Sequence, residues 1–208
     1  MAIRLEQRVT RPTQDMAFDT EGQTATPPAQ EQTLRERVTT SRFGEIEVEE
    51  DLIITLPEGL IGFEKCTRFV VVHHDESSAF RWFQSLDEAS VAFPIMEPGI
   101  FRPDYAPIIS DADARFLELT TTEVPTLVFT ILTIPSQDVQ LITANMLGPI
   151  VINGQTRRGK QVIAQDEGLT TRHRLVDELA RKERLSLAST AVTVSLSRNQ
   201  GKKMARVA

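Results

Sequence analysis

The sequence predicts an all-β domain, because three stretches carry the residue patterns of strands. Residues 145–166 (NMLGPIVINGQTRRGKQVIAQD) contain apolar, largely β-branched runs on both sides of a polar, basic turn, as in two paired strands. Residues 124–134 (VPTLVFTILTI) form the strongest apolar segment and place apolar side chains on both faces of an extended chain, as a central strand requires. In residues 45–49, Ile46 and Val48 alternate with glutamates, which indicates a half-buried strand.

The predicted strands, including those above, follow one another in chain order through the same domain. Their residue ranges are 45–49, 52–56, 68–73, 80–86, 91–96 and 124–134, followed by the two arms of 145–166. The first two ranges predict a hairpin that turns at residues 49–51. Pro94 lacks a backbone donor, which indicates an edge position or a bulge for residues 91–96.

An ordered loop and a short helix are predicted between the strands. Residues 98–107 (PGIFRPDYAP) contain three prolines, and Ile100, Phe101 and Tyr105 are expected to anchor this loop. Ser110 followed by Asp113 matches a helix N-terminal capping pattern and predicts a helix of two to three turns.

The turn inside residues 145–166 has two possible geometries. Asn153-Gly154 could form a tight hairpin turn, or Gly154 could be a bulge in a longer strand that turns near Arg158. The bulge is favoured because it pairs two apolar segments. Gly159 is then expected to supply a positive φ at the turn.

Composition divides the 208 residues into three parts. Residues 1–40 are polar, include the low-complexity stretch TATPPAQ, and are expected to be a disordered extension, with a short helix at residues 31–38 as an alternative. Residues 41–174 are predicted to be the folded domain. Residues 175–208 are predicted to start with a solvated helix and to end in a flexible basic tail.

The charges differ between these parts. Residues 41–174 contain 11 basic and 20 acidic side chains, a net charge of -9, whereas residues 175–208 contain 7 and 3, a net charge of +4. An acidic body repels phosphate backbones, so it disfavours nucleic acid and favours a basic partner. There is no apolar run of about 18 residues that could span a membrane and no secretory signal, which makes the cytoplasm the expected location.

No arrangement of catalytic or metal-binding residues is predicted. His73 and His74 are adjacent and would point to opposite faces of a strand, and His173 lies in a basic turn. Asp111 and Asp113 are explained by a helix start, where acidic side chains are favourable. Cys66, the single cysteine, is expected to be a small buried or half-buried thiol. We therefore expect no enzyme activity, no cofactor and no metal.

Seven short motifs identify a known family. In chain order they are LPEGLIGFE (56–64), FQSL (83–86), EP (97–98), FRPDY (101–105), NMLGPIVIN (145–153), TRRGKQVI (156–163) and TRH (171–173). In this order and spacing the chain resembles the flagellar assembly factor FliW family over residues 43–173. Gly148 and Gly154 depart from the residues that family members often carry there.

The resemblance implies a compact, antiparallel β-barrel-like domain with one or two short helices and no catalytic activity. It also implies two protein partners: the RNA-binding translational regulator CsrA, whose RNA binding the factor antagonises, and flagellin, which takes the factor away from CsrA until flagellin is exported. The expected partner-binding residues are Phe101, Pro103, Asp104, Tyr105, Asn145, Asn153, Arg157, Lys160 and Gln161. The alternative for these residues is that they stabilise loops.

Two other functions stay open at this point. A direct RNA-binding module would use the basic turn at residues 157–160 and the basic C-terminal tail. A hydrolase with an unrecognised site, in which one of the three histidines could serve as the base, is the second. Salt dependence of RNA binding tests the first, and substitution of the histidines tests the second.

Overall fold

The computed structural model describes residues 2–4, 34–73, 78–119, 121, 123–135 and 138–187. Most of the predicted N-terminal extension, the C-terminal residues 188–208 and His74 lie outside the described residues.

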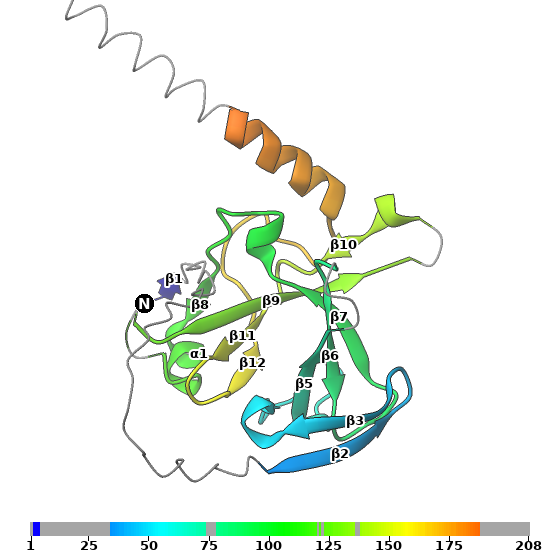
Figure 1. The fold of residues 1–208 in the computed structure, drawn as a ribbon. Coiled ribbons are helices and arrows are strands. Elements are labelled where there is room, and N and C mark those ends of the chain that lie inside the picture. Colours follow the sequence, from blue (N-terminus) through cyan, green and yellow to red (C-terminus); the bar gives the residue numbers. More distant parts are fainter. Residues whose placement is uncertain are drawn as a thin grey trace, which may run out of the picture.

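A curved antiparallel sheet forms the centre of the molecule (Figure 1). Its strands lie in the order β12-β11-β9-β7-β6-β5-β4, and β10 pairs with both β9 and β13 beside this path. The strands are β4 (Ile54–Thr55), β5 (Arg68–Val72), β6 (Arg81–Ser85), β7 (Ala92–Met96), β9 (Thr126–Thr133), β10 (Thr143–Ala144), β11 (Ile150–Asn153), β12 (Gly159–Gln161) and β13 (His173–Arg174).

The sheet curls without closing into a barrel. Its two end strands, β4 and β12, come together in the described residues through one parallel bridge, Thr55–Arg158, where Thr55 N donates to the Arg157 carbonyl over 3.0 Å. A closed barrel needs a hydrogen-bonded ladder between every pair of neighbouring strands. The predicted antiparallel β domain is thus confirmed, but a closed barrel is not formed, because a single bridge between the two ends is not a ladder.

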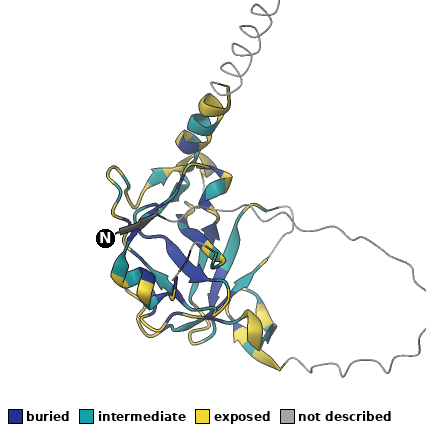
Figure 2. Ribbon diagram, turned by 90° about the vertical axis from the view of Figure 1, so that its left-hand side faces the viewer, coloured by how far each residue is buried: buried dark blue, intermediate teal, exposed yellow. Residues whose placement is uncertain are grey.

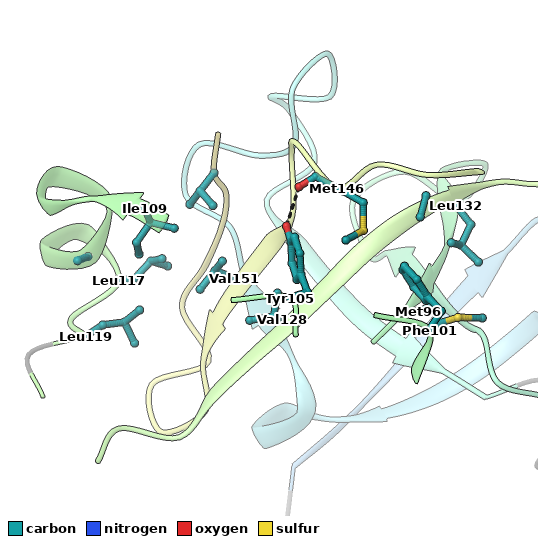
Figure 3. Close-up of a cluster of buried hydrophobic side chains, with 13 residues drawn as sticks. Met96, Phe101, Tyr105, Ile109, Leu117, Leu119, Val128, Leu132, Met146 and Val151 are labelled. Atoms are coloured by element: carbon teal, nitrogen blue, oxygen red, sulfur yellow. Dashed lines mark hydrogen bonds between the residues drawn. The ribbon is translucent and has the colours of Figure 1, made fainter. Parts of the chain in front are cut away.

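Two hydrophobic cores use opposite faces of this sheet. The inner core, inside the curve, contains Leu56, Phe69, Phe83, Phe129 and Ile150 among others. The outer core packs the other face of the sheet against the segment 96–119 (Figure 3). Because β9 and β11 contribute alternate residues to each core, the prediction of a central strand that is apolar on both faces is confirmed for β9.

Two helices lie outside the sheet. Helix α1 (Asp111–Phe116) begins where predicted: Ser110 is its N-cap, and the Ser110 side chain accepts a hydrogen bond from Asp113 N over 3.1 Å. It follows β8 (Ile108–Ser110), which pairs with β1 (Ala2–Arg4). A second helix covers residues 175–187, as the charge pattern predicts, and projects away from the sheet (Figures 1 and 2). Short 3-10 helices are η1 (Glu50–Leu52), η2 (Pro98–Ile100) and η3 (Val139–Leu141).

The first hairpin lies earlier in the chain than predicted. β2 (Arg35–Thr40) pairs with β3 (Gly44–Glu49), and η1 replaces the predicted turn at residues 49–51. For residues 35–40, disorder and the alternative short helix are therefore both wrong. β2 forms a backbone ladder with β3 along its whole length, from Arg35↔Glu49 to Thr40↔Gly44, although its composition resembles that of a disordered segment. Arg35 and Arg37 add exposed cross-strand ion pairs to glutamates of β3, at 2.7 Å and 2.8 Å.

Two backbone predictions are also corrected. β7, which contains Pro94, has neighbours on both sides and is not an edge strand; its ladder with β9 starts at Ile95, so the missing donor of Pro94 falls outside that ladder. The turn after β11 spans residues 154–157, and its positive φ of 57° belongs to Arg157 rather than Gly159. Gly159 lies in β12, where a Cβ would approach Leu56 Cδ1 to 3.0 Å.

Gly154 is neither a bulge nor half of a two-residue turn. It starts the four-residue turn, and its N–H donates to the Pro125 carbonyl over 2.6 Å. A Cβ at this position would lie 2.8 Å from that carbonyl oxygen. The close approach of the two chains explains the glycine.

Candidate partner-binding surfaces

The nine predicted site residues fall into two regions of the surface. Phe101, Pro103, Asp104 and Tyr105 belong to the loop after η2, which the helix at 175–187 contacts. The remaining five lie around the ends of β11 and β12. The structure does not bring all nine into one site.

Phe101 and Tyr105 are buried in the outer core and present almost no surface to a partner. Phe101 has a relative exposure of 0%. The Tyr105 hydroxyl donates to the Met146 carbonyl over 2.6 Å (Figure 3), and burial raises the pKa of this phenol. These contacts support the alternative that both residues stabilise the loop. Pro103 and Asp104 are exposed.

Asp104 forms an ion pair that joins the helix at 175–187 to this loop. Arg181 donates to both carboxylate oxygens of Asp104, and Lys182 Nζ donates to the Ile100 carbonyl over 2.6 Å. The hydrogen bonds and charge of Arg181 hold the pKa of Asp104 below its usual value. We refer to this arrangement of residues 98–105 with residues 175–187 as the helix–loop contact.

A half-buried polar cluster at the start of that helix supports the same contact. Glu178 Oε1 accepts from Arg102 over 3.3 Å and lies 3.0 Å from His173 Nδ1. Thr170 N donates to His173 Nε2 over 3.0 Å, so Nδ1 carries the proton and donates to Glu178. His173 is thereby positioned by its neighbours as part of a structural network.

Asn153 organises the turn after β11 from a buried position, with 1% exposure. Its Nδ2 donates to the Leu117 carbonyl over 2.9 Å, and its Oδ1 accepts from the backbone N–H groups of Gln155 and Thr156. An asparagine that satisfies donors and acceptors in this way holds a turn against α1. Its burial also supports the stabilising alternative.

Lys160 and Arg158, two of the cations of the basic turn, are already engaged within the protein. Lys160 Nζ lies 2.9 Å from Glu58 and 3.0 Å from Asp113, and these carboxylates raise the pKa of Lys160 although burial opposes the shift. The Arg158 guanidinium stacks on Phe116 at 4.4 Å from the ring centroid. Arg157 is half-buried. Phosphate binding would have to break or share these contacts.

Asn145 and Gln161 both bond to Gly148, just before the start of β11. Asn145 Oδ1 accepts from Gly148 N over 2.8 Å. Gln161 Nε2 donates to the Gly148 carbonyl over 3.1 Å, and Gln161 Oε1 accepts from Ile61 N over 3.0 Å. Gln161 therefore ties the loop at residues 57–64 to the strands, a contact that local sequence patterns do not predict.

The described residues contain no group of three or more His, Cys, Asp or Glu side chains that could hold a metal ion. Cys66 is buried, as predicted. Within the same part of the chain, none of the helices has the length and apolar character needed to cross a membrane.

Comparison with known proteins decides the family. Residues 37–175 match the FliW protein family. The chain belongs to the FliW family. Its relatives include the flagellar assembly factor FliW of Leptospira interrogans, 35% identical over 69% of this chain and 95% of the relative, and that of Natranaerobius thermophilus, 36% identical over 71% and 97%. Family membership confirms a non-enzymatic assembly factor.

A solved FliW structure shares the fold. The crystal structure of a flagellar assembly factor FliW superposes with a TM-score of 0.61 and 31% identity, covering 67% of this chain and 96% of that one. The family match ends at residue 175, so most of the helix at 175–187 lies beyond it.

Proposed function

We propose that this chain is a flagellar assembly factor that binds CsrA, prevents it from binding RNA, and binds flagellin as an alternative partner. The observation that carries the proposal is the FliW family match over residues 37–175. The two partners come from the resemblance of the motifs to that family. In the cytoplasm, free flagellin would withdraw the factor from CsrA, and export of flagellin would return it, which couples flagellin translation to export.

The charge of the folded part supports a basic protein partner. Residues 41–174 carry a net charge of -9. A protein that binds RNA needs a basic surface, so CsrA and this body attract each other. Once bound, the acidic body adds repulsion against an approaching phosphate chain.

The arrangement of the basic turn weighs against direct RNA binding. Lys160 is paired with two carboxylates and Arg158 lies on an aromatic ring. Both cations therefore lose favourable contacts if they turn to a phosphate. The loss of these contacts disfavours RNA binding by the turn, and therefore favours protein binding over the RNA-binding alternative.

A competition experiment tests the proposed function. Purified chain should bind purified CsrA, release a labelled RNA from CsrA, and lose both effects when flagellin is added. A filter-binding titration of the chain alone with RNA serves as the control and should show no steeply salt-dependent binding. Absence of CsrA binding at micromolar concentration and low salt would overturn the proposal.

A further inference from the structure

Strand β8 has two edges, and one of them is joined to residues 165–166. Ile108 N donates to Asp166 Oδ2 over 2.6 Å, and the Ile108 carbonyl accepts from Gln165 N over 2.8 Å. The backbone groups of successive residues in a strand point to opposite sides. The N–H and C=O of the next residue, Ile109, therefore face the other edge of β8.

Strand β1 occupies that other edge (Figure 1). Its three residues pair antiparallel with the three residues of β8, in a register that sets Ile3 opposite Ile109. Because the backbone groups of Ile109 face β1, Ile3 and Ile109 are the pair that exchanges hydrogen bonds. The N–H of the next residue, Arg4, then points away from β8.

The two strands differ in their relation to the family. β8 lies inside the family match of residues 37–175, whereas β1 lies outside it. In the flagellar assembly factor FliW of Leptospira interrogans, the aligned part of 143 residues makes up 95% of the protein. An N-terminal segment as long as residues 1–36 does not fit in the remainder. Compared with that relative, β1 is an addition that covers an edge of the shared domain.

Strand β1 is short enough to leave this edge. One pair of facing residues supplies two backbone hydrogen bonds, and each such bond contributes little net stability in water. Ordering the three residues of β1 costs conformational entropy of a similar size. A terminal segment held in this way opens more often than the strands of the central sheet. The edge therefore alternates between an occupied and an open state.

We propose that the outer edge of β8 is a strand-acceptor site and that β1 closes this site from within the same chain. The site takes an extended segment, because the N–H and C=O of Ile109 pair with a backbone. β1 itself shows what fits: a short strand with an apolar residue, Ile3, opposite Ile109. An open edge pairs readily with other chains, so β1 protects it. The site does not depend on the proposed function.

Hydrogen exchange at the Ile109 amide tests whether β1 closes the site. Ile3→Pro removes the donor that faces Ile109 and should speed exchange of this amide at least about tenfold. Arg4→Pro is the matched control, because it introduces the same residue where the N–H points away from β8, and should change the rate less than about twofold. Both positions lie outside the family match, so far-UV circular dichroism should stay as in the wild type. Equal exchange in the wild type and in Ile3→Pro overturns the closure.

A synthetic peptide with the sequence of residues 1–8 tests whether the site accepts a strand from outside. At millimolar concentration it should shift the Ile109 amide NMR signal of the Ile3→Pro variant, and it should bind at least about tenfold more weakly to the wild type, in which β1 competes. The same peptide carrying Ile3→Pro should bind neither protein.

Three results would contradict the proposal. Failure of the peptide to bind the Ile3→Pro variant overturns the acceptor site. Equal binding to the variant and to the wild type overturns the competition by β1. A wild-type dimer in size-exclusion chromatography that Ile3→Pro converts to a monomer would place β1 on a second copy of the chain, and closure within one chain would be wrong.

Discussion

Gly59 and Gly62 lie in the same loop and both have positive φ, but they differ in the space around them. Gly62→Ala meets no atom within 4 Å and should cost about 1–2 kcal/mol for the left-handed backbone. Gly59→Ala also places a Cβ 2.6 Å from backbone atoms and should cost at least about 2 kcal/mol more. Denaturant unfolding of the two variants measures the difference. Equal stabilities would show that the loop at residues 57–64 relaxes freely.

Asn153 is predicted to matter for stability more than Asn145. Asn153→Ala removes the buried amide that bonds the Leu117 carbonyl and two backbone N–H groups, and should lower the free energy of unfolding by about 2–4 kcal/mol. Asn145→Ala removes one bond to Gly148 from a half-buried position and should cost about 1 kcal/mol. Urea unfolding compares them. If Asn153→Ala instead lost CsrA affinity while keeping wild-type stability, the residue would be a contact rather than a support.

Among the elements, the helix–loop contact depends on charge. Arg181→Ala should speed amide exchange in the first turns of the helix at 175–187, whereas Arg184→Ala, at an exposed position of the same helix, should not. The cost should not exceed about 1 kcal/mol, because the Arg181 and Asp104 side chains are 34% and 48% exposed. Hydrogen exchange followed residue by residue makes the measurement. Equal effects of the two substitutions would contradict a specific pair.

The pH dependence of this contact follows from the lowered pKa of Asp104. A carboxyl group whose pKa is lower in the folded than in the unfolded state stabilises the fold fully above its unfolded pKa, near about 4. That stabilisation is lost as the pH falls through the folded value. Amide NMR signals of the helix near Arg181 should therefore include a titration shift below about pH 4 that comes from Asp104. In Asp104→Asn this shift should be absent.

Elements could be predicted from sequence wherever one local pattern determined them. The alternating apolar pattern of β9 and the Ser110–Asp113 capping pattern each extend over only a few residues, and both predictions are confirmed. β2 was missed because its residues are mostly polar, while its order comes from the backbone ladder to β3, which a polar local pattern does not indicate. The partners of Asp104 and Ile61 lie 77 and 100 residues away, so no local pattern could reveal the helix–loop contact or the bond from Gln161 to the loop at residues 57–64.

At the scale of the whole molecule, the two cores should unfold together. β9 places Val128 and Leu132 in the outer core and Phe129 in the inner core, and β11 divides its side chains in the same way. Neither core can lose its packing while the other keeps both strands in place. A shared sheet of this kind predicts a single cooperative transition.

A matched pair of substitutions tests this coupling. Leu56 and Leu117 are both fully buried, the first in the inner core and the second in the outer core. Leu56→Ala and Leu117→Ala should each lower the free energy of unfolding by about 2–5 kcal/mol. Fluorescence of Trp82, the single tryptophan, which lies in β6, should follow the same curve as far-UV circular dichroism in both variants. If Leu117→Ala lowered the dichroism midpoint while Trp82 kept its wild-type transition, the outer core would be an independent unit and the coupling through β9 and β11 would be refuted.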